Sequence, residues 1–296
     1  MFIFDRQKPP TLLVMESLSH RMMISGKHEE YLYYLQKGHA AEVAYDGQLE
    51  EIGNQVVIFP GILLQPRLAN PFQWDTIILA GSIFYLYEIK SFSGEYCYGE
   101  ETWLSSTGFE ISNPHIQMQD NKNRFTSLLR ELGYGKEFQV KAYPTFVEPN
   151  FTLFHAPNDQ PLLLPSQLKH HFADLKKGAT PFTTRHHQVV ADLLAHQRVE
   201  KVFRDHVPVY DFKSLRKGVR CPVCGSFELG QRRQTYLCAK CGHKDTIFSL
   251  LYFHINEVSL LFPNEKVTSK LLNHWCGGIY HQRRLKRALN KFYQGD

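Results

Sequence analysis

The chain has 296 residues, of which 43% are hydrophobic and 21% are charged, a composition that excludes a disordered chain and is typical of a globular protein. No apolar run approaches the roughly 20 residues of a membrane helix, and no secretory signal is recognisable, so we expect a cytoplasmic protein without membrane association. The net charge of +5 divides unevenly, because residues 1–200 hold 17 Lys and Arg against 22 Asp and Glu, whereas residues 201–296 hold 17 against 7.

The first predicted elements are a helix and a β-hairpin. Residues 28–52 are polar with spaced apolar side chains, which predicts a helix with Glu42 facing the interior. Gly81 and Ser82 separate two β-type runs and suit a two-residue hairpin loop. The predicted strands lie at residues 55–59, 72–79 and 83–90.

A second helix should begin at Asn113 and Pro114, with Asn as the cap and Pro in the first turn, and end near Gly133. Helical and strand signals alternate beyond it, which predicts an α/β or α+β fold. The further elements are strands at residues 138–147 and 151–155 and helices at residues 166–177 and 184–205.

The predicted hairpin brings two carboxylates together. A two-residue loop pairs Ala80 with Ile83, and counting back along both strands places Asp75 opposite Glu88. Facing like charges destabilise a strand pair, and a divalent cation such as Mg²⁺ would resolve the conflict. Lys90 shares a face with Glu88 and would lie beside an attacked phosphate.

Glu42 would complete this cluster from the preceding helix. These residues also have a simpler interpretation, since a carboxylate near a strand end is often solvated and a Glu-x-Lys pair on a strand is often a surface ion pair. The spacing alone leaves a structural and a catalytic role open.

A set of motif residues lies in order along residues 28–135, namely Gly38 and Glu42, then Gln73, Trp74 and Asp75, then Glu88, Ile89 and Lys90, then Gly94 and Trp103, then Asn113, Pro114 and Gln117. With this set, residues 28–135 resemble the nuclease-related domain (NERD) family, a branch of the PD-(D/E)xK nuclease superfamily. The chain departs from the family's usual pattern where Ala41 replaces a second Gly before the Glu, and where Thr76 replaces a common His. Neither departure removes a charged position.

The resemblance implies a restriction-endonuclease-like core, with a mixed central sheet flanked by helices, and an activity in DNA processing. By the same resemblance, Asp75 and Glu88 become ligands of Mg²⁺ or Mn²⁺, and Lys90 becomes the catalytic lysine. Glu42 becomes a supporting carboxylate, and Gln117 an active-site helper or phosphate contact.

Four of the six cysteines predict a zinc ribbon. A glycine after the second cysteine of a CxxC pair permits a tight turn in which backbone amides approach the sulfurs. Four thiolates hold Zn²⁺ tetrahedrally and leave no open position, so the site would be structural. The two pairs are Cys221 and Cys224 before Gly225, and Cys238 and Cys241 before Gly242.

Basic side chains accompany the ribbon and continue into the tail. Together with an aromatic ring they suit contact with a nucleic-acid backbone and its bases. Zinc ribbons also dock proteins, so a protein partner is the alternative at this point. The candidate nucleic-acid-binding residues are Arg232, Arg233 and Tyr236 in the ribbon and Arg283, Arg284, Lys286 and Arg287 in the tail.

The leading hypothesis is a Mg²⁺-dependent nuclease that acts on DNA, with the ribbon and tail binding the strand. The alternatives are a nucleic-acid-binding or regulatory protein that keeps the fold with little or no catalysis, and an adaptor that docks a protein through the ribbon. The expected segments are an N-terminal extension (1–27), the nuclease-like domain (28–180), a helical connector (181–218), the zinc ribbon (219–245) and a basic helical region with C-terminal helices (246–296).

Overall fold

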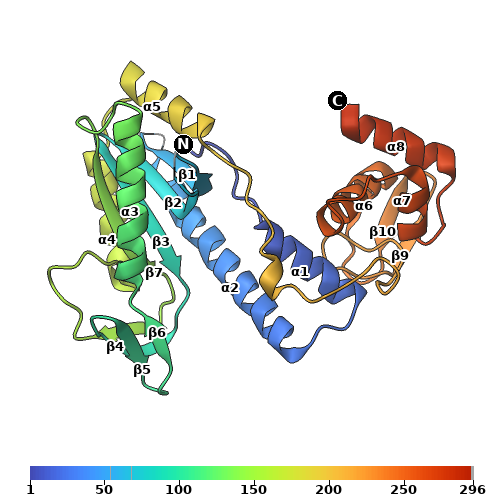
Figure 1. The fold of residues 1–296 in the computed structure, drawn as a ribbon, viewed down its shortest axis with the longest axis horizontal. Helices are drawn as coiled ribbons and strands as arrows, with labels where there is room; N and C mark the ends of the chain where they lie inside the picture. The colour runs from blue at the N-terminus through green and yellow to red at the C-terminus, as the bar shows by residue number, and fades with distance from the viewer. Residues whose placement is uncertain (54, 68, 295–296) are drawn as a thin grey trace. The chain divides into compact units, whose positions relative to one another are not determined.

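The computed structural model describes residues 1–53, 55–67 and 69–294. The chain forms two compact units, of which the first comprises residues 1–8 and 35–200 and the second residues 9–34 and 201–296 (Figure 1). This division differs from the segments expected along the sequence, because residues 9–34 belong with the C-terminal part of the chain. The helix α1 (Pro10–Arg21) places Val14 and Leu18 in the core of the second unit.

The first unit is built on a mixed four-stranded sheet in the order β1-β2-β3-β7. The first three strands pair antiparallel, and β7 pairs parallel to β3. This arrangement confirms the mixed central sheet that was expected. The strands are β1 (Val57–Leu64), β2 (Phe72–Ala80), β3 (Ile83–Lys90) and β7 (Gln139–Phe146).

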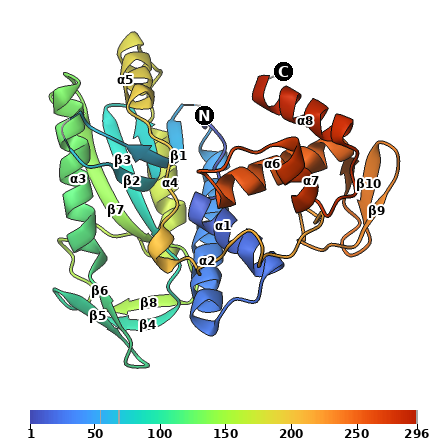
Figure 2. The same ribbon diagram turned by 45° about the vertical axis from the view of Figure 1, so that its right-hand side comes forward.

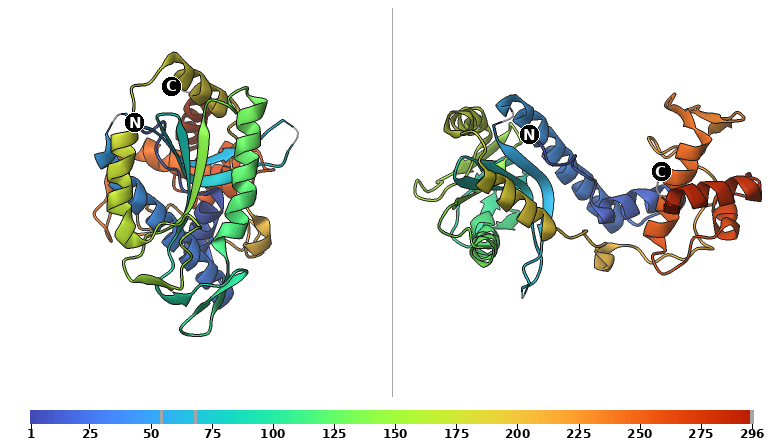
Figure 3. Two further views of the ribbon diagram at one scale, coloured as in Figure 1. Left: turned by 90° about the vertical axis from the view of Figure 1, so that its left-hand side faces the viewer. Right: turned by 90° about the horizontal axis from the view of Figure 1, so that it is seen from above.

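Helices cover both faces of this sheet (Figure 3). On one face, α3 (Pro114–Glu131) and α5 (Thr184–Ala195) bury apolar side chains against the strands. On the other face, α2 (Gly26–Leu49), η1 (Glu50–Ile52) and α4 (Leu168–Gly178) do the same. The short helix η2 (Pro165–Gln167) precedes α4. The result is a sheet with an apolar core on each side.

A smaller sheet lies at one end of the first unit (Figure 2). Its strand order is β6-β5-β4-β8, and the buried Trp103 packs against Phe146 of the central sheet with ring centroids 5.4 Å apart. Its strands are β4 (Gly94–Cys97), β5 (Thr102–Ser105), β6 (Glu110–Ser112) and β8 (Phe151–Phe154).

Two elements differ from their predicted bounds. The strand β1 continues through Pro60 and Gly61 to Leu64, because an edge strand tolerates a missing N–H. The helix predicted over residues 184–205 ends at Ala195, after which Gln197 forms a bridge with Leu64.

The second unit surrounds a core to which α1, α6 and α8 contribute most of the buried side chains. In its centre, Glu257 accepts hydrogen bonds from Arg21, Arg220 and Trp275 and contacts His254 at 2.9 Å. The other elements are η3 (Arg204–His206), β9 (Leu229–Gln231), β10 (Thr235–Cys238), β11 (Lys244–Thr246), α6 (Ile247–Leu261), α7 (Ser269–Trp275) and α8 (Gln282–Gln294).

A membrane-crossing segment would need greater length and apolar character than any helix in the described part of the chain possesses.

Candidate functional site

The β2–β3 hairpin has the predicted register. Gly81 adopts a φ of +52°, which the tight loop requires, and Ala80 pairs with Ile83. The ladder runs down to Thr76 opposite Tyr87. One step further along the same register, Asp75 comes opposite Glu88.

Asp75 lies at a position of β2 that is paired with neither of the neighbouring strands. On the β3 side, pairing ends at Thr76, and the Asp75 Oδ2 atom instead accepts the Ile89 N–H at 2.7 Å. On the β1 side, the ladder passes over Asp75 and the opposite residue Gly61, whose φ is +62°. The Asp75 carboxyl therefore lies where the pairing of the sheet is interrupted on both sides of β2.

Arg6 fills the gap on the β1 side, a role that was not predicted from the sequence. Its Nη2 atom donates to the Asp75 carbonyl oxygen at 2.8 Å and to Thr76 Oγ1 at 2.9 Å. Arg6 thereby replaces the missing ladder contact of Asp75. The motifs of residues 28–135 do not include Arg6, because Arg6 precedes that segment.

Arg6 also holds two carboxylates of α2. It donates to Glu42 Oε2 at 2.7 Å, and it grips Asp46 with two hydrogen bonds of 2.6 and 2.9 Å. Only 4% of the Arg6 side chain is exposed. Glu42 thus lies beside Arg6, with which it pairs, and its completion of the carboxylate cluster stays a prediction.

Glu88 and Lys90 meet on the same face of β3. The Lys90 Nζ atom lies 3.0 Å from Glu88 Oε1, and 17% of the Glu88 side chain and 22% of the Lys90 side chain are exposed. This partial burial keeps the pair close to solvent. An incoming ligand could reach both groups.

The carboxylates influence one another electrostatically. Burial raises the pKa of the Asp75 carboxyl well above its usual range, and the charges of Glu88 and Glu42 raise it further. Lys90 and the hydrogen bond from Ile89 lower the pKa without reversing the shift. Burial and the neighbouring carboxylates together therefore disfavour the ionised form of Asp75.

Glu42 shows the same effect. Burial raises its pKa, Arg6 opposes that rise, and the charges of Asp46 and Glu88 contribute to a pKa of about 7. A bound cation would favour the ionised form of each carboxyl group and relieve their repulsion.

The donor set fits a hard divalent cation of the Mg²⁺ type, which takes one or two carboxylates and retains water. Glu42, Asp75 and Glu88 do not converge as three ligands on one point. Across residues 1–53, 55–67 and 69–294, only the four cysteines form a group of three or more potential ligands close enough for one ion.

Gln117 is exposed in the first turn of α3. It does not join the buried stripe of that helix, which Phe125 and Leu128 form with Met118. The Asn113 side chain caps the helix by accepting the His115 N–H at 3.0 Å, as predicted from the Asn-Pro pair. A phosphate contact by Gln117 stays a prediction.

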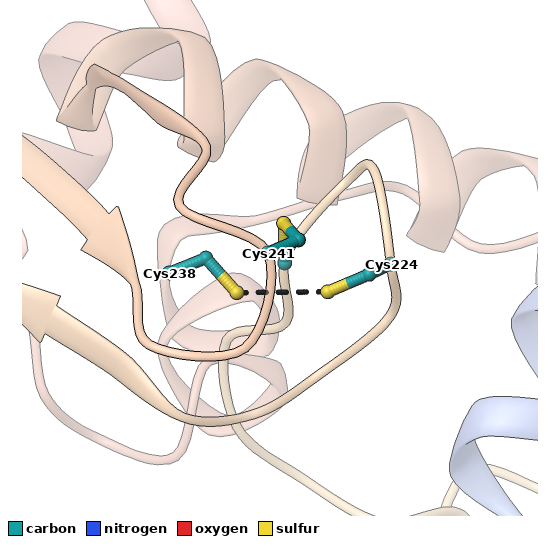
Figure 4. Close-up of side chains that lie close together, drawn as sticks. Cys224, Cys238 and Cys241 are labelled. Atoms are coloured by element: carbon teal, nitrogen blue, oxygen red, sulfur yellow. Dashed lines mark hydrogen bonds between the residues drawn. The ribbon is translucent and has the colours of Figure 1, made fainter.

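The second candidate centre is the cysteine cluster, whose four sulfur atoms all lie within 4.8 Å of one another. The Cys221 and Cys241 sulfurs are 3.7 Å apart, and those of Cys224 and Cys238 are 3.5 Å apart (Figure 4). A zinc ion with Zn–S distances of about 2.3 Å implies sulfur separations of about 3.8 Å in a tetrahedron. The cluster could therefore hold a metal ion such as Zn²⁺.

The thiols of the cluster influence one another's protonation. Burial opposes ionisation of Cys238, but the N–H groups of Cys241 and Lys240 lower its pKa to about 7. The His243 N–H lowers the pKa of Cys241, whereas burial and the other thiols raise it to about 12. A metal ion would displace the protons that the thiols otherwise share.

The turns around the cluster need glycine, as the sequence predicted. Gly225 and Gly242 have φ values of +70° and +72°, and their N–H groups donate to Cys221 and Cys238 carbonyls. A Cβ atom at Gly225 would also lie 2.2 Å from the His20 ring. The first turn is therefore packed directly against α1.

The candidate nucleic-acid-binding residues do not all share one environment. Tyr236 is only 1% exposed and packs in the core, so its predicted role in base stacking is wrong. Strand alternation turned this ring inward, while Leu237 faces solvent. The six basic residues lie at the surface, with Arg284 half-buried and Arg232, Arg233, Arg283, Lys286 and Arg287 exposed.

Residues 37–147 match the family model of the nuclease-related domain (NERD). The NERD match contains Glu42, Asp75, Glu88 and Lys90, and it confirms the family resemblance predicted from the sequence motifs. It supports a nuclease-like fold. Arg6 and the cysteine cluster lie outside the matched residues.

Among solved structures, the crystal structure of protein VC1899 from Vibrio cholerae is similar, with 16% identity and a TM-score of 0.25. The similarity covers 51% of this chain and 33% of that chain, so this chain spans about a third of its length. No curated protein matches the chain.

Proposed function

We propose that this protein is a divalent-cation-dependent nuclease that hydrolyses phosphodiester bonds in nucleic acid, with DNA as the first substrate to test. The observation that carries the proposal is the interruption of the sheet at Asp75, where a buried carboxyl with a strongly raised pKa lies near Glu88 and Lys90. The NERD match supports the same activity class.

Asp75 and Glu88 would hold Mg²⁺ or Mn²⁺. When bound, the ion would neutralise phosphate charge and lower the pKa of a water molecule. Lys90 would donate to a non-bridging phosphate oxygen and stabilise the charge that grows there. Glu88 keeps the lysine at the site through their 3.0 Å contact. Glu42, fixed by Arg6, would add negative potential at the edge.

The cysteine cluster would hold structural Zn²⁺, because four thiolates leave no coordination position for a substrate. The ribbon and the basic tail would then bind the nucleic acid rather than cut it. Their charge makes phosphate the natural partner.

The test is cleavage of labelled single-stranded and duplex DNA and RNA by the purified full chain, with Mg²⁺, with Mn²⁺ or with neither ion added. Chelators are avoided because they would also remove zinc. We expect Asp75→Asn and Lys90→Ala to lower the cleavage rate by at least about 100-fold while DNA binding is nearly unchanged.

Asp159→Asn and Lys136→Ala make the same chemical changes at exposed positions and should cleave like the unaltered protein. Unchanged cleavage by both site variants would remove the assigned site.

The second candidate is a nucleic-acid-binding protein that does not cleave its ligand. It is favoured by the pairing of Glu42 with Arg6, which occupies a carboxylate that a catalytic metal ion could otherwise use. DNA binding without cleavage under every metal condition would select it. An adaptor role would instead show as salt-insensitive association with a protein.

A further inference from the structure

The second unit contains a groove of about 860 Å³ between α6, α8 and the β9–β10 turn. This volume lies in the range of ligand-binding sites, ~300–1,000 Å³. Figure 2 shows α8 alongside α6. Five basic residues line the groove, namely Arg233, Arg283, Arg284, Arg287 and Lys291.

The charge of the groove is one-sided, because none of the described residues that line it is acidic. The nearby Asp245 is engaged with the first turn of α6, where it accepts from the Thr246 N–H and from Ser249 Oγ at 2.6 Å. The same turn is capped by Thr246, whose Oγ1 accepts the Ser249 N–H. The arginines, rather than the helix end, therefore supply the attraction for an anion.

Two aromatic rings also line the groove. Phe248 and Tyr252 are four residues apart on α6, so they lie on the same face, and both are half-buried. Their ring centroids are 6.4 Å apart, and the Arg287 guanidinium lies 5.5 Å from the centre of the Phe248 ring. Basic and aromatic groups are thus interleaved within one concavity.

We infer that this groove binds single-stranded nucleic acid, with phosphates on the arginines of α8 and bases against Phe248 and Tyr252. Base stacking on aromatic rings within a basic groove is how single strands are bound without sequence preference. A duplex would keep its base faces stacked inside and could use only the charges. The inference deepens the proposed function, on which it rests for its substrate class.

The groove also distinguishes two groups of basic residues, all of which were predicted from the sequence to bind nucleic acid. Arg233, Arg283, Arg284 and Arg287 line the groove, whereas Arg232 and Lys286 do not. The neighbouring exposed residues therefore provide a control of equal charge.

The test measures fluorescence anisotropy of labelled oligo(dT) and of a labelled dA·dT duplex with the zinc-loaded full chain, without added Mg²⁺ or chelator. Phe248→Leu and Tyr252→Leu should each weaken oligo(dT) binding about tenfold and leave duplex binding unchanged. Tyr252→Phe keeps the ring and should bind normally. Equal losses on both DNA forms would overturn the stacking role.

The Arg283→Ala/Arg287→Ala double variant tests the phosphate contacts at two exposed positions. Removing two contacts should reduce the slope of log affinity against log salt by about 1.4 for a single strand. Arg232→Ala/Lys286→Ala is the matched control and should retain the slope. If it loses as much affinity as the groove variant, a diffuse basic surface replaces the groove.

Thermal melting and zinc content establish that each variant is folded, and the arginine pair alone decides the outcome if a ring variant unfolds. Poly-glutamate serves as a competitor for labelled oligo(dT). If it displaces the label as effectively as unlabelled oligo(dT) does, the groove binds acidic protein and the inference is overturned. Binding is measured without catalysis, so the two proposals can fail separately. Groove-dependent binding without any cleavage would support the groove and contradict the nuclease proposal. Cleavage by the protein together with normal binding by the groove variants would support the nuclease proposal and contradict the groove.

Discussion

Arg6 determines the local charge balance beside Asp75. Two α2 carboxylates and one backbone carbonyl share its guanidinium, and the pKa of Arg6 is raised because these contacts outweigh the effect of burial. Removing one partner of a buried ion pair leaves the other partner uncompensated. Arg6 is therefore a positioning residue for the carboxylates.

We expect Arg6→Met to lower the free energy of unfolding of the first unit by about 3 kcal/mol. Arg67→Met is the control, because Arg67 is 83% exposed and pairs with Glu131 only at 3.9 Å. Adding Glu42→Gln to Arg6→Met should restore part of the loss, since it removes an unpaired charge. Urea denaturation measures all three proteins, and equal stability of the Arg6 and Arg67 variants would contradict the assigned role.

The positions of the hairpin residues were predictable from the sequence, but their contacts with distant residues were not. The position of Asp75 opposite Glu88 follows from loop length and strand alternation, which are local rules. The contact of Arg6 with Asp75 joins residues 69 positions apart and depends on the unpaired position of Gly61 in the β1–β2 ladder. Tyr236 was misplaced for a related reason, because a three-stranded ribbon packed on helices buries one face of β10.

At the scale of elements, α4 is joined to the central sheet through a histidine. His171 makes a 2.8 Å hydrogen bond to the Tyr87 hydroxyl and contacts the rings of Tyr85 and Tyr143. Burial lowers the pKa of His171 to about 4, and Lys141 and His170 act in the same direction, whereas Asp174 opposes the shift. The neutral ring is the form that packs against β3 and β7.

A lowered histidine pKa means that the unfolded chain binds the proton first as the pH falls. The contribution of His171 to stability is therefore complete above a pH of about 6.5 and is lost as the pH falls toward 4. We expect His171→Gln to flatten this part of the pH dependence of thermal melting. His170→Gln, at a side chain that is 81% exposed, should leave it unchanged, and the same flattening in both variants would refute the assignment.

Element bounds were predictable where local signals were strong. Asn113 and Pro114 begin α3 as expected, and Gly133, with a φ of +83°, follows its end. The end of α5 was not predictable, because the apolar pattern continues beyond Ala195 while tertiary pairing of Gln197 with Leu64 takes over the backbone. The place of α1 was also hidden, since its partners lie near the other end of the chain.

At the scale of the whole molecule, each unit has its own hydrophobic core. The core of the second unit contains residues of α1, α6 and α8 together with Tyr236 and Cys276, and the first unit has separate cores on the two faces of its central sheet. The cysteine cluster belongs to the second unit alone. Loss of its metal ion should therefore act on one unit and spare the other.

We expect the zinc chelator TPEN to destabilise residues 9–34 and 201–296, because a structural zinc site contributes its binding free energy to folding. In hydrogen–deuterium exchange, peptides of this unit should lose protection, whereas peptides of β1, β2 and β3 should keep it. Added Zn²⁺ should reverse the change. Cys241→Ser should reproduce the effect of TPEN, and Cys97→Ser, at an exposed cysteine outside the cluster, should not. Equal loss of protection in both units would contradict the assignment of the cluster's stabilising effect to residues 9–34 and 201–296 alone.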